Sequence, residues 1–310
     1  TTGANTVSNN TIHTLKLTSA TATTQKIEIT GMLIGGGTFA HNVTRNNIHS
    51  LSILSNDTAA VITGIDNSAG TVTFANNMVR LGIDENGTPV TTGCMIRGIT
   101  KGNSSSCNFW HNSVYIGGSG VTNGVAGSLR QSYAFVRGTN GAADDVRNNI
   151  FSNQRSNAGA TGATHYAIRL SSGTSGLNLN NNVYYFTGNG GVFGYNGTAN
   201  VANYAAGWAA GDLLSYETNP QFLAPNGSAF IGDLHINPSV GTLVEQTGTT
   251  IASVTEDFDG QIRASLSPND IGADAGNFIS LACTGTPSGG TPSISQSSIC
   301  AGNAVSLFLS

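Results

Sequence analysis

Charged side chains are scarce in this chain of 310 residues. Asp, Glu, Lys and Arg make up 9% of it, against about 25% in ordinary soluble domains. Three Lys and nine Arg, within a formal net charge of −4, cannot form the basic stripe expected of a nucleic-acid binder. No run of 18 apolar residues occurs, so membrane insertion is not expected either. The composition therefore argues against nucleic acid and the membrane as partners.

Cysteine and histidine are also few, and neither forms a metal-binding motif. The four Cys include no CxxC pair, and the six His form no HxH or HExxH, so no metal site is expected. The spacings suggest two disulfides, Cys283 with Cys300 and Cys94 with Cys107, which would fit an oxidising, extracytoplasmic setting. Free buried thiols are the alternative.

Asparagine is abundant instead, with 34 residues beside 41 Gly, and it recurs at a regular interval. The recurring phrase is an Asn, usually the second of a pair, followed by short apolar or β-branched residues. Examples are NNIF at 148–151 and NNVY at 181–184, and His111 replaces the first Asn in one repeat. The phrase occurs at Asn10, Asn47, Asn77, Asn112, Asn149 and Asn182.

Between these phrases lie β-branched or aromatic runs next to Gly or Ser, such as AAVITGID at 59–66 and YAFVRGTNG at 133–141. Two or three short strands per repeat, without helical periodicity, predict an all-β solenoid of stacked coils. Coils about 4.8 Å apart would place equivalent Asn side chains over one another, where each amide can hydrogen-bond its neighbours and the turn backbone. We therefore interpret the Asn residues as a structural ladder.

Several phrases resemble those of a known family. They are VRNNIFSNQ at 146–154, YAIRLSSG at 166–173 and LNLNNNVYYF at 177–186, followed by an ending with a helix-like stretch and four short motifs. The motifs are Asn219-Pro220-Gln221-Phe222, Leu234-His235, Asp259-Gly260 with Arg263, and Asp270-Ile271-Gly272-Ala273.

On these motifs, residues 5–278 resemble right-handed parallel β-helix proteins of the pectate-lyase-like superfamily, in the form secreted by Bacteroidetes-type bacteria. The resemblance implies a right-handed parallel β-helix domain at 1–278, finished by the closing motifs. It also implies an extracellular or cell-surface location, reached by type IX secretion. It leaves the activity open, because this fold hosts lyases, hydrolases, adhesins and structural proteins alike.

Residues 279–310 differ in kind. A Thr/Pro/Gly/Ser linker leads into a strand-like alternation that resembles the beginning of an Ig-like module. The chain also starts at Thr1 without Met. We therefore expect a piece of a longer polypeptide, whose partners are the other modules of that polypeptide or the secretion machinery.

Three arginines are the first candidates for ligand binding. Aligning the strand phrases places Arg97, Arg137 and Arg169 at equivalent positions, and a stacked column of like charges needs compensation. One interpretation is an anion site for uronate or sulfate groups of a polysaccharide. The other is a solvated column, or one paired with acids such as Asp144 or Asp145.

Two kinds of polysaccharide-degrading catalysis would suit the fold. A lyase needs a base and a helper, for which Arg97 and Lys101 could serve, and often Ca²⁺, for which the short acidic run at 256–259 offers few ligands. A glycosidase needs two carboxylates from neighbouring coils. Asp144 and Asp145 are adjacent, so in a strand they would point to opposite faces. No catalytic residue is assigned, and Ca²⁺ is the one cofactor considered.

Two further residues are candidates for contact with sugars. Trp110 exposes a flat apolar ring face that would suit a glycan, although aromatic side chains also pack cores. Thr58, in Asp57-Thr58-Ala59, resembles the acceptor at which such bacteria attach O-glycans.

These observations predict a non-catalytic module of a larger extracellular or cell-surface protein. We expect a structural or adhesive role, with a glycan contacting the Arg and aromatic faces. The alternative function is a polysaccharide lyase or glycoside hydrolase acting on an anionic polysaccharide.

Overall fold

The computed structural model describes most of the chain as two units, Thr1–Ser280 and Leu281–Ser310. The described residues are 3–18, 27–37, 39–55, 57, 59–122, 130–141, 143–209, 211–266, 269–281, 292–294 and 307–309. In the second unit, β25 (Pro292–Ile294) pairs antiparallel with β26 (Leu307–Leu309).

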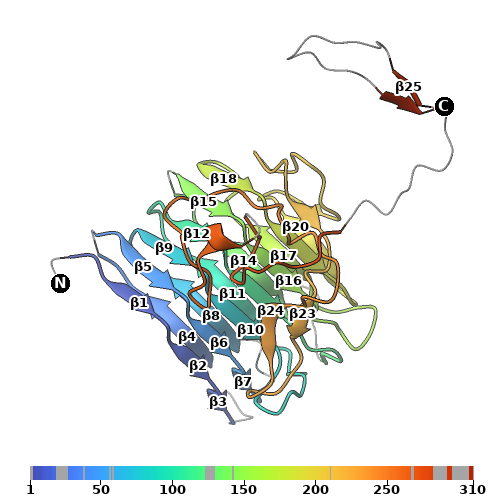
Figure 1. Ribbon diagram of the computed structural model, residues 1–310. Coiled ribbons are helices and arrows are strands. Elements are labelled where there is room, and N and C mark those ends of the chain that lie inside the picture. Colours follow the sequence, from blue (N-terminus) through green and yellow to red (C-terminus); the bar gives the residue numbers. More distant parts are fainter. Residues whose placement is uncertain are drawn as a thin grey trace. The chain divides into compact units, whose positions relative to one another are not determined.

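The first unit is an all-β solenoid of about six turns. Each turn contributes one strand to each of three sheets, and strands of successive turns pair in parallel (Figure 1). The first sheet contains β1 (Thr6–Ser8), β5 (His41–Thr44), β9 (Val72–Ala75), β12 (Asn108–Trp110), β15 (Asp144–Arg147) and β18 (Leu177–Asn180).

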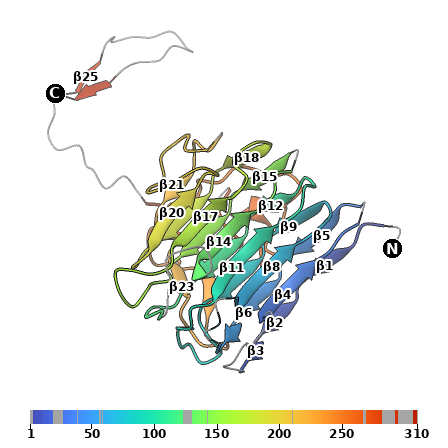
Figure 2. The ribbon, with the colours of Figure 1, turned by 180° about the vertical axis from the view of Figure 1, so that it is seen from behind.

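The second and third sheets complete the coil. The second sheet contains β2 (Thr11–His13), β6 (Asn47–His49), β10 (Met78–Leu81), β13 (Ser113–Ile116), β16 (Ile150–Asn153), β19 (Val183–Phe186) and β22 (Tyr216–Glu217). The third sheet (Figure 2) contains β4 (Glu28–Ile34), β8 (Val61–Asn67), β11 (Met95–Lys101), β14 (Ser132–Arg137), β17 (His165–Leu170), β20 (Gly191–Tyr195) and the antiparallel β21 (Asn200–Val201).

A few elements lie outside these sheets. β3 (Lys16–Leu17) pairs in parallel with β7 (Ser52–Ile53), and β23 (Phe222–Ala224) pairs antiparallel with β24 (Asp233–Ile236). A 3-10 helix covers Arg263–Ser265. The helix-like stretch expected before Asn219 instead consists of turns and the short β22 among its described residues.

The core is built from side chains that repeat at one position of each coil. In the first sheet the inward row is Val7, Val43, Phe74, Phe109, Val146 and Leu179. The rings of Phe74 and Phe109 stack with centroids 5.0 Å apart. The period of two along each strand places these residues inside and the polar ones outside.

The predicted asparagine ladder is present, with one residue different. Along the ladder, each Nδ2 donates to the Oδ1 of the next coil's Asn at 2.9 to 3.0 Å. In the second coil the ladder residue is Asn46, whose side chain is fully buried, and the expected Asn47 lies outside it. The ladder therefore runs through Asn10, Asn46, Asn77, Asn112, Asn149 and Asn182, and Ser215 takes the next position.

The residue before each ladder Asn adopts a left-handed backbone conformation. Its φ lies between 52° and 59° at Asn9, Arg45, Asn76, His111, Asn148 and Asn181. Asn adopts this conformation at little energetic cost. This explains why the residue directly before a ladder Asn is so often another Asn. The two members of each pair thus have different tasks, one in the turn and one in the ladder.

The closing segment, defined here as residues 219–278, does not simply end the solenoid. It runs back along the second sheet, toward earlier coils (Figure 1). Its backbone carbonyls at 247, 249, 256 and 258 accept hydrogen bonds from Asn181, Asn148, Asn76 and Arg45 respectively. A second apolar core fills the contact, formed by Met78, Ile150 and Val183 of the sheet with Leu234, Ile236, Val244 and Ile271.

The ladder makes a direct prediction at the Asn46-Asn47 pair. Asn46→Ala should lower the free energy of unfolding by about 2–4 kcal/mol, because it removes a fully buried amide that bonds the exposed Asn10 on one neighbouring coil and the buried Asn77 on the other. Asn47→Ala, the matched control one position away, should change it by less than about 1 kcal/mol. Urea denaturation of both variants measures the difference, and equal losses would contradict the observed register.

Stability should also depend on the buried His165. Its ring accepts or donates at Ser132 and Asn157, and burial, with Arg155 nearby, lowers its pKa to about 3. Between pH 6.5 and 3 the unfolded chain binds a proton there that the folded chain does not. Stability is therefore complete above about pH 6.5 and falls as the pH decreases, by up to about 1.4 kcal/mol per pH unit from this group.

Urea denaturation between pH 7 and 4 checks this, with His165→Gln as the comparison. The variant should be less stable at pH 7 but should have a shallower pH slope. An unchanged slope would mean that His165 does not titrate as described.

Candidate functional site

The predicted column of three arginines is wrong. Arg97 pairs in register with Tyr133, while Arg137 pairs with Lys101, and Arg169 pairs with Val136. The shared Arg-Gly and Arg-Leu phrases therefore mark different positions of the coil. Arg97 and Arg169 are half-buried, whereas Arg137 is fully buried.

Arg137 contacts an acid that the sequence offered as its partner. Its Nε donates to Asp144 Oδ2 at 2.7 Å, and Lys101 Nζ lies 3.4 Å from the same oxygen, all within the protein interior. The other guanidinium nitrogens donate to Asn140 and to backbone carbonyls. Burial lowers the pKa of Lys101, and Asp144 opposes this. The group fixes the corner between the third and first sheets and leaves Arg137 no donor for a ligand.

Asp145 points outward, to the opposite face from Asp144, as its adjacency predicts. Its carboxylate accepts two hydrogen bonds from Arg147, at 2.7 and 2.6 Å. Arg169 also lies on an outer face, that of the third sheet, where its guanidinium sits over the rings of Tyr133, Tyr166 and Tyr195. Tyr133 and Tyr166 are almost fully buried, so this face offers few open rings.

Trp110 lies in a groove on the outer face of the first sheet. Outward-pointing side chains at equivalent positions of successive strands form two rows across this sheet, both rich in amides and hydroxyls. Trp110 lies in one of these rows. Its ring borders a cavity of about 500 Å³, and its indole Nε1–H has no hydrogen-bond partner among the described residues. The groove is lined by Thr6, Asn42, Thr44, Arg45, Thr73, Asn76, Trp110 and residues 253–256.

The closing segment forms one wall of this groove, through residues 253–256. Arg45 Nη1 contacts Glu256 Oε2 there at 2.6 Å. On the next outward row, Asn108, of the same strand as Trp110, borders a second recess with Asp145 and Asn178. Strand β12 borders both recesses. Arg45, beside the first, is paired with Glu256, and Arg147, near the second, is paired with Asp145.

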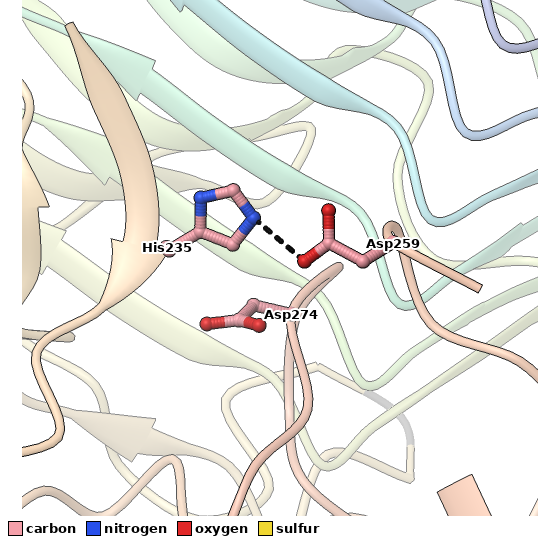
Figure 3. A group of neighbouring side chains, drawn as sticks. All are labelled: His235, Asp259 and Asp274. Carbon is pink, nitrogen blue, oxygen red and sulfur yellow. Dashed lines mark hydrogen bonds and ion pairs between the residues drawn. The ribbon is translucent and has the colours of Figure 1, made fainter. Parts of the chain in front are cut away.

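A second candidate site, not anticipated from the sequence, lies in the closing segment (Figure 3). His235 of β24 meets Asp259 and Asp274 from two separate loops, with one potential ligand atom of each within 4.8 Å of the others. His235 Nε2 lies 3.0 Å from Asp259 Oδ2, and its Nδ1 lies 2.5 Å from Asp233 Oδ1. The hydrogen bond with Asp233 is the main cause that raises the pKa of His235 to about 9.

The sequence motifs include two of the three residues of this cluster. Leu234-His235 and Asp259-Gly260 are two of the closing motifs, and Asp274 directly follows a third. What the sequence lacks is any indication that three distant segments meet. Burial raises the pKa of Asp274 to about 6.

The cysteine predictions have two outcomes. Cys94 and Cys107 are buried free thiols, so the disulfide expected between them is wrong. Burial raises the pKa of both, as for inert structural thiols. Cys283, Cys300 and the candidate O-glycosylation residue Thr58 lie outside the described residues.

Comparison with known proteins leaves the chain without an assigned relative. No family model, no curated protein and no solved structure matches it. Among the described residues, no helix has the length and apolar character needed to cross a membrane. The chain is therefore classed by its architecture alone, as a parallel β-solenoid.

The adjacent acids on β15 allow a matched test of this description. Asp144→Ala should lower the free energy of unfolding by about 3–5 kcal/mol, because it leaves Lys101 and Arg137 buried without their counter-charge. Asp145→Ala removes a partly exposed ion pair and should cost about 1 kcal/mol or less. Thermal and urea unfolding of both variants measure the costs, and a larger loss from Asp145→Ala would contradict the assigned faces.

Proposed function

We propose that this chain is a non-catalytic β-solenoid module of a larger extracellular or cell-surface protein, and that it binds a glycan in the Trp110 groove. The observation that carries the proposal is Trp110 itself. Its indole ring is partly exposed and lines the groove, where it offers a sugar a flat apolar face; the Nε1–H is itself buried. Around it, Asn42, Thr44 and Thr73 supply the amide and hydroxyl groups that sugar hydroxyls need.

The charges at the groove favour a neutral glycan over an anionic one. Arg45 is paired with Glu256, and Arg147 with Asp145. Each guanidinium is therefore already largely neutralised by a carboxylate, which weakens its attraction for a uronate or sulfate. The binding energy would then come from stacking and hydrogen bonding rather than from net charge.

The architecture supports the structural part of the proposal. Ladders of Asn and a continuous core give a rigid rod-like element suited to holding a binding face away from other modules. The proposal includes membership of the pectate-lyase-like β-helix superfamily, in a Bacteroidetes-type secreted protein. It also includes an Ig-like module that begins with the β25–β26 pair.

Glycan-array binding with Trp110→Ala tests the groove. The wild-type chain should bind a neutral glycan, and Trp110→Ala should weaken this about tenfold or more, because a buried aromatic anchor carries more than 1 kcal/mol. Phe230→Ala removes a ring that is 90% exposed outside the groove and serves as the control. Binding should change little between about 0.05 and 0.5 M salt.

Either of two results would contradict the proposal. One is equal binding by the wild type and Trp110→Ala. The other is binding restricted to anionic glycans and abolished by salt. Release of products from pectin, alginate or glycosaminoglycans would favour the alternative, a polysaccharide lyase or glycoside hydrolase.

A further inference from the structure

The cluster around His235 has the composition and spacing of a metal site. His235 Nε2 and Asp259 Oδ2 are 3.0 Å apart. A metal ion about 2.0–2.2 Å from each ligand holds neighbouring ligand atoms about 3 Å apart. Asp274 brings a carboxylate oxygen within 4.8 Å of both. The three side chains therefore need only small shifts to share one ion (Figure 3).

The imidazole is held in the orientation that a metal ligand requires. Its Nδ1 lies 2.5 Å from Asp233 Oδ1, and Asp233 also accepts the backbone N–H of His235 at 2.9 Å. With Nδ1 donating to Asp233, Nε2 points at Asp259 and is the nitrogen that a metal ion would bind in place of a proton. A carboxylate on the far nitrogen of a metal-bound His is the usual second contact of such sites.

Asp274 brings its carboxylate to the cluster from the protein interior. Its exposed fraction is 6%, and its Oδ2 accepts the backbone N–H of Ile236 at 2.7 Å. Among the ion pairs of the described residues, none joins Asp274 to a Lys or Arg. A buried carboxylate without a paired cation is costly, and a metal ion beside it would remove that cost.

The charge balance points the same way. Asp233, Asp259 and Asp274 surround a single imidazole. Two arginines lie near the cluster. Arg263 donates to backbone carbonyls and to Asn76 rather than to these carboxylates. Arg80, which lines the same cavity as Asp233 and His235, donates to the carbonyl of Gly227 and to Ser50. A cavity of about 250 Å³ borders Asp233, His235 and Phe258, which gives an ion a route in and room for water ligands.

We propose that His235, Asp259 and Asp274 bind one divalent transition-metal ion, with Zn²⁺ as the representative ion and Asp233 orienting the imidazole. A nitrogen ligand with two carboxylates suits Zn²⁺ and its neighbours, whereas Ca²⁺ and Mg²⁺ prefer oxygen ligands throughout. The ion would join β24 to the two loops that carry Asp259 and Asp274. It would thereby fasten the closing segment, independently of glycan binding in the groove.

The test is metal titration of the full 310-residue chain after chelator treatment. Isothermal calorimetry with Zn²⁺ should give one site per chain, and Zn²⁺ at 100 times its Kd should raise the Tm by about 5 °C. Co²⁺ in place of Zn²⁺ should give visible absorption bands that report nitrogen and oxygen ligands.

Three variants assign the ligands. Asp259→Ala removes an exposed carboxylate and should abolish the Tm shift while leaving the metal-free Tm nearly unchanged. Asp233→Asn should weaken Zn²⁺ binding roughly 10–100-fold. Glu217→Gln, an exposed acid elsewhere in the unit, is the matched control and should bind Zn²⁺ as the wild type does.

Three results would overturn the proposal. They are no stoichiometric Zn²⁺ or Co²⁺ binding below about 0.1 mM, tighter binding of Ca²⁺ than of Zn²⁺, and unchanged Zn²⁺ binding in Asp259→Ala. None of them bears on the Trp110 groove, which the glycan experiment tests separately.

Discussion

The fold depends on one requirement, that the amide turned inward at each coil must find hydrogen-bond partners in the neighbouring coils. The ladder Asn residues meet it with amide groups that donate and accept along the axis. Asn149 Nδ2 donates to Asn182 Oδ1 and to the carbonyl of Phe109, two coils away from each other. Each Asn thereby fixes the register between its own coil and the coils on both sides. This register places equivalent apolar side chains of successive coils over one another.

The closing segment reuses the same turns for a second purpose. The left-handed residue that opens each turn points its side chain outward, and at Asn76, Asn148 and Asn181 this side chain holds closing-segment backbone. The segment in turn forms one wall of the Trp110 groove and carries the His235 cluster. Both candidate sites therefore exist because an irregular segment lies against a regular sheet.

The solenoid, its all-β class and the ladder could be predicted from the sequence because the Asn phrase repeats with the coil. The assignment of Asn47 failed because two Asn stand side by side and only the coil geometry distinguishes them. The arginines failed for a related reason. Arg97 precedes the tightly packed Gly98, and the residue equivalent to Gly98 in the next coil is Ala134. Arg137 precedes a different glycine, Gly138, which lies four residues further along that coil. The His235 cluster joins residues up to 39 positions apart in segments without periodicity, so no pattern could place them together.

The backward course of the closing segment changes how such a molecule should come apart. A simple solenoid has only nearest-neighbour contacts, so its end coils can fray one by one. Here Arg45 and Glu256 are bonded across 211 residues, and the early coils cannot peel away without releasing the last part of the domain. Loss of structure should consequently be cooperative over the whole unit, and folding should be slow because the final contacts close so long a loop.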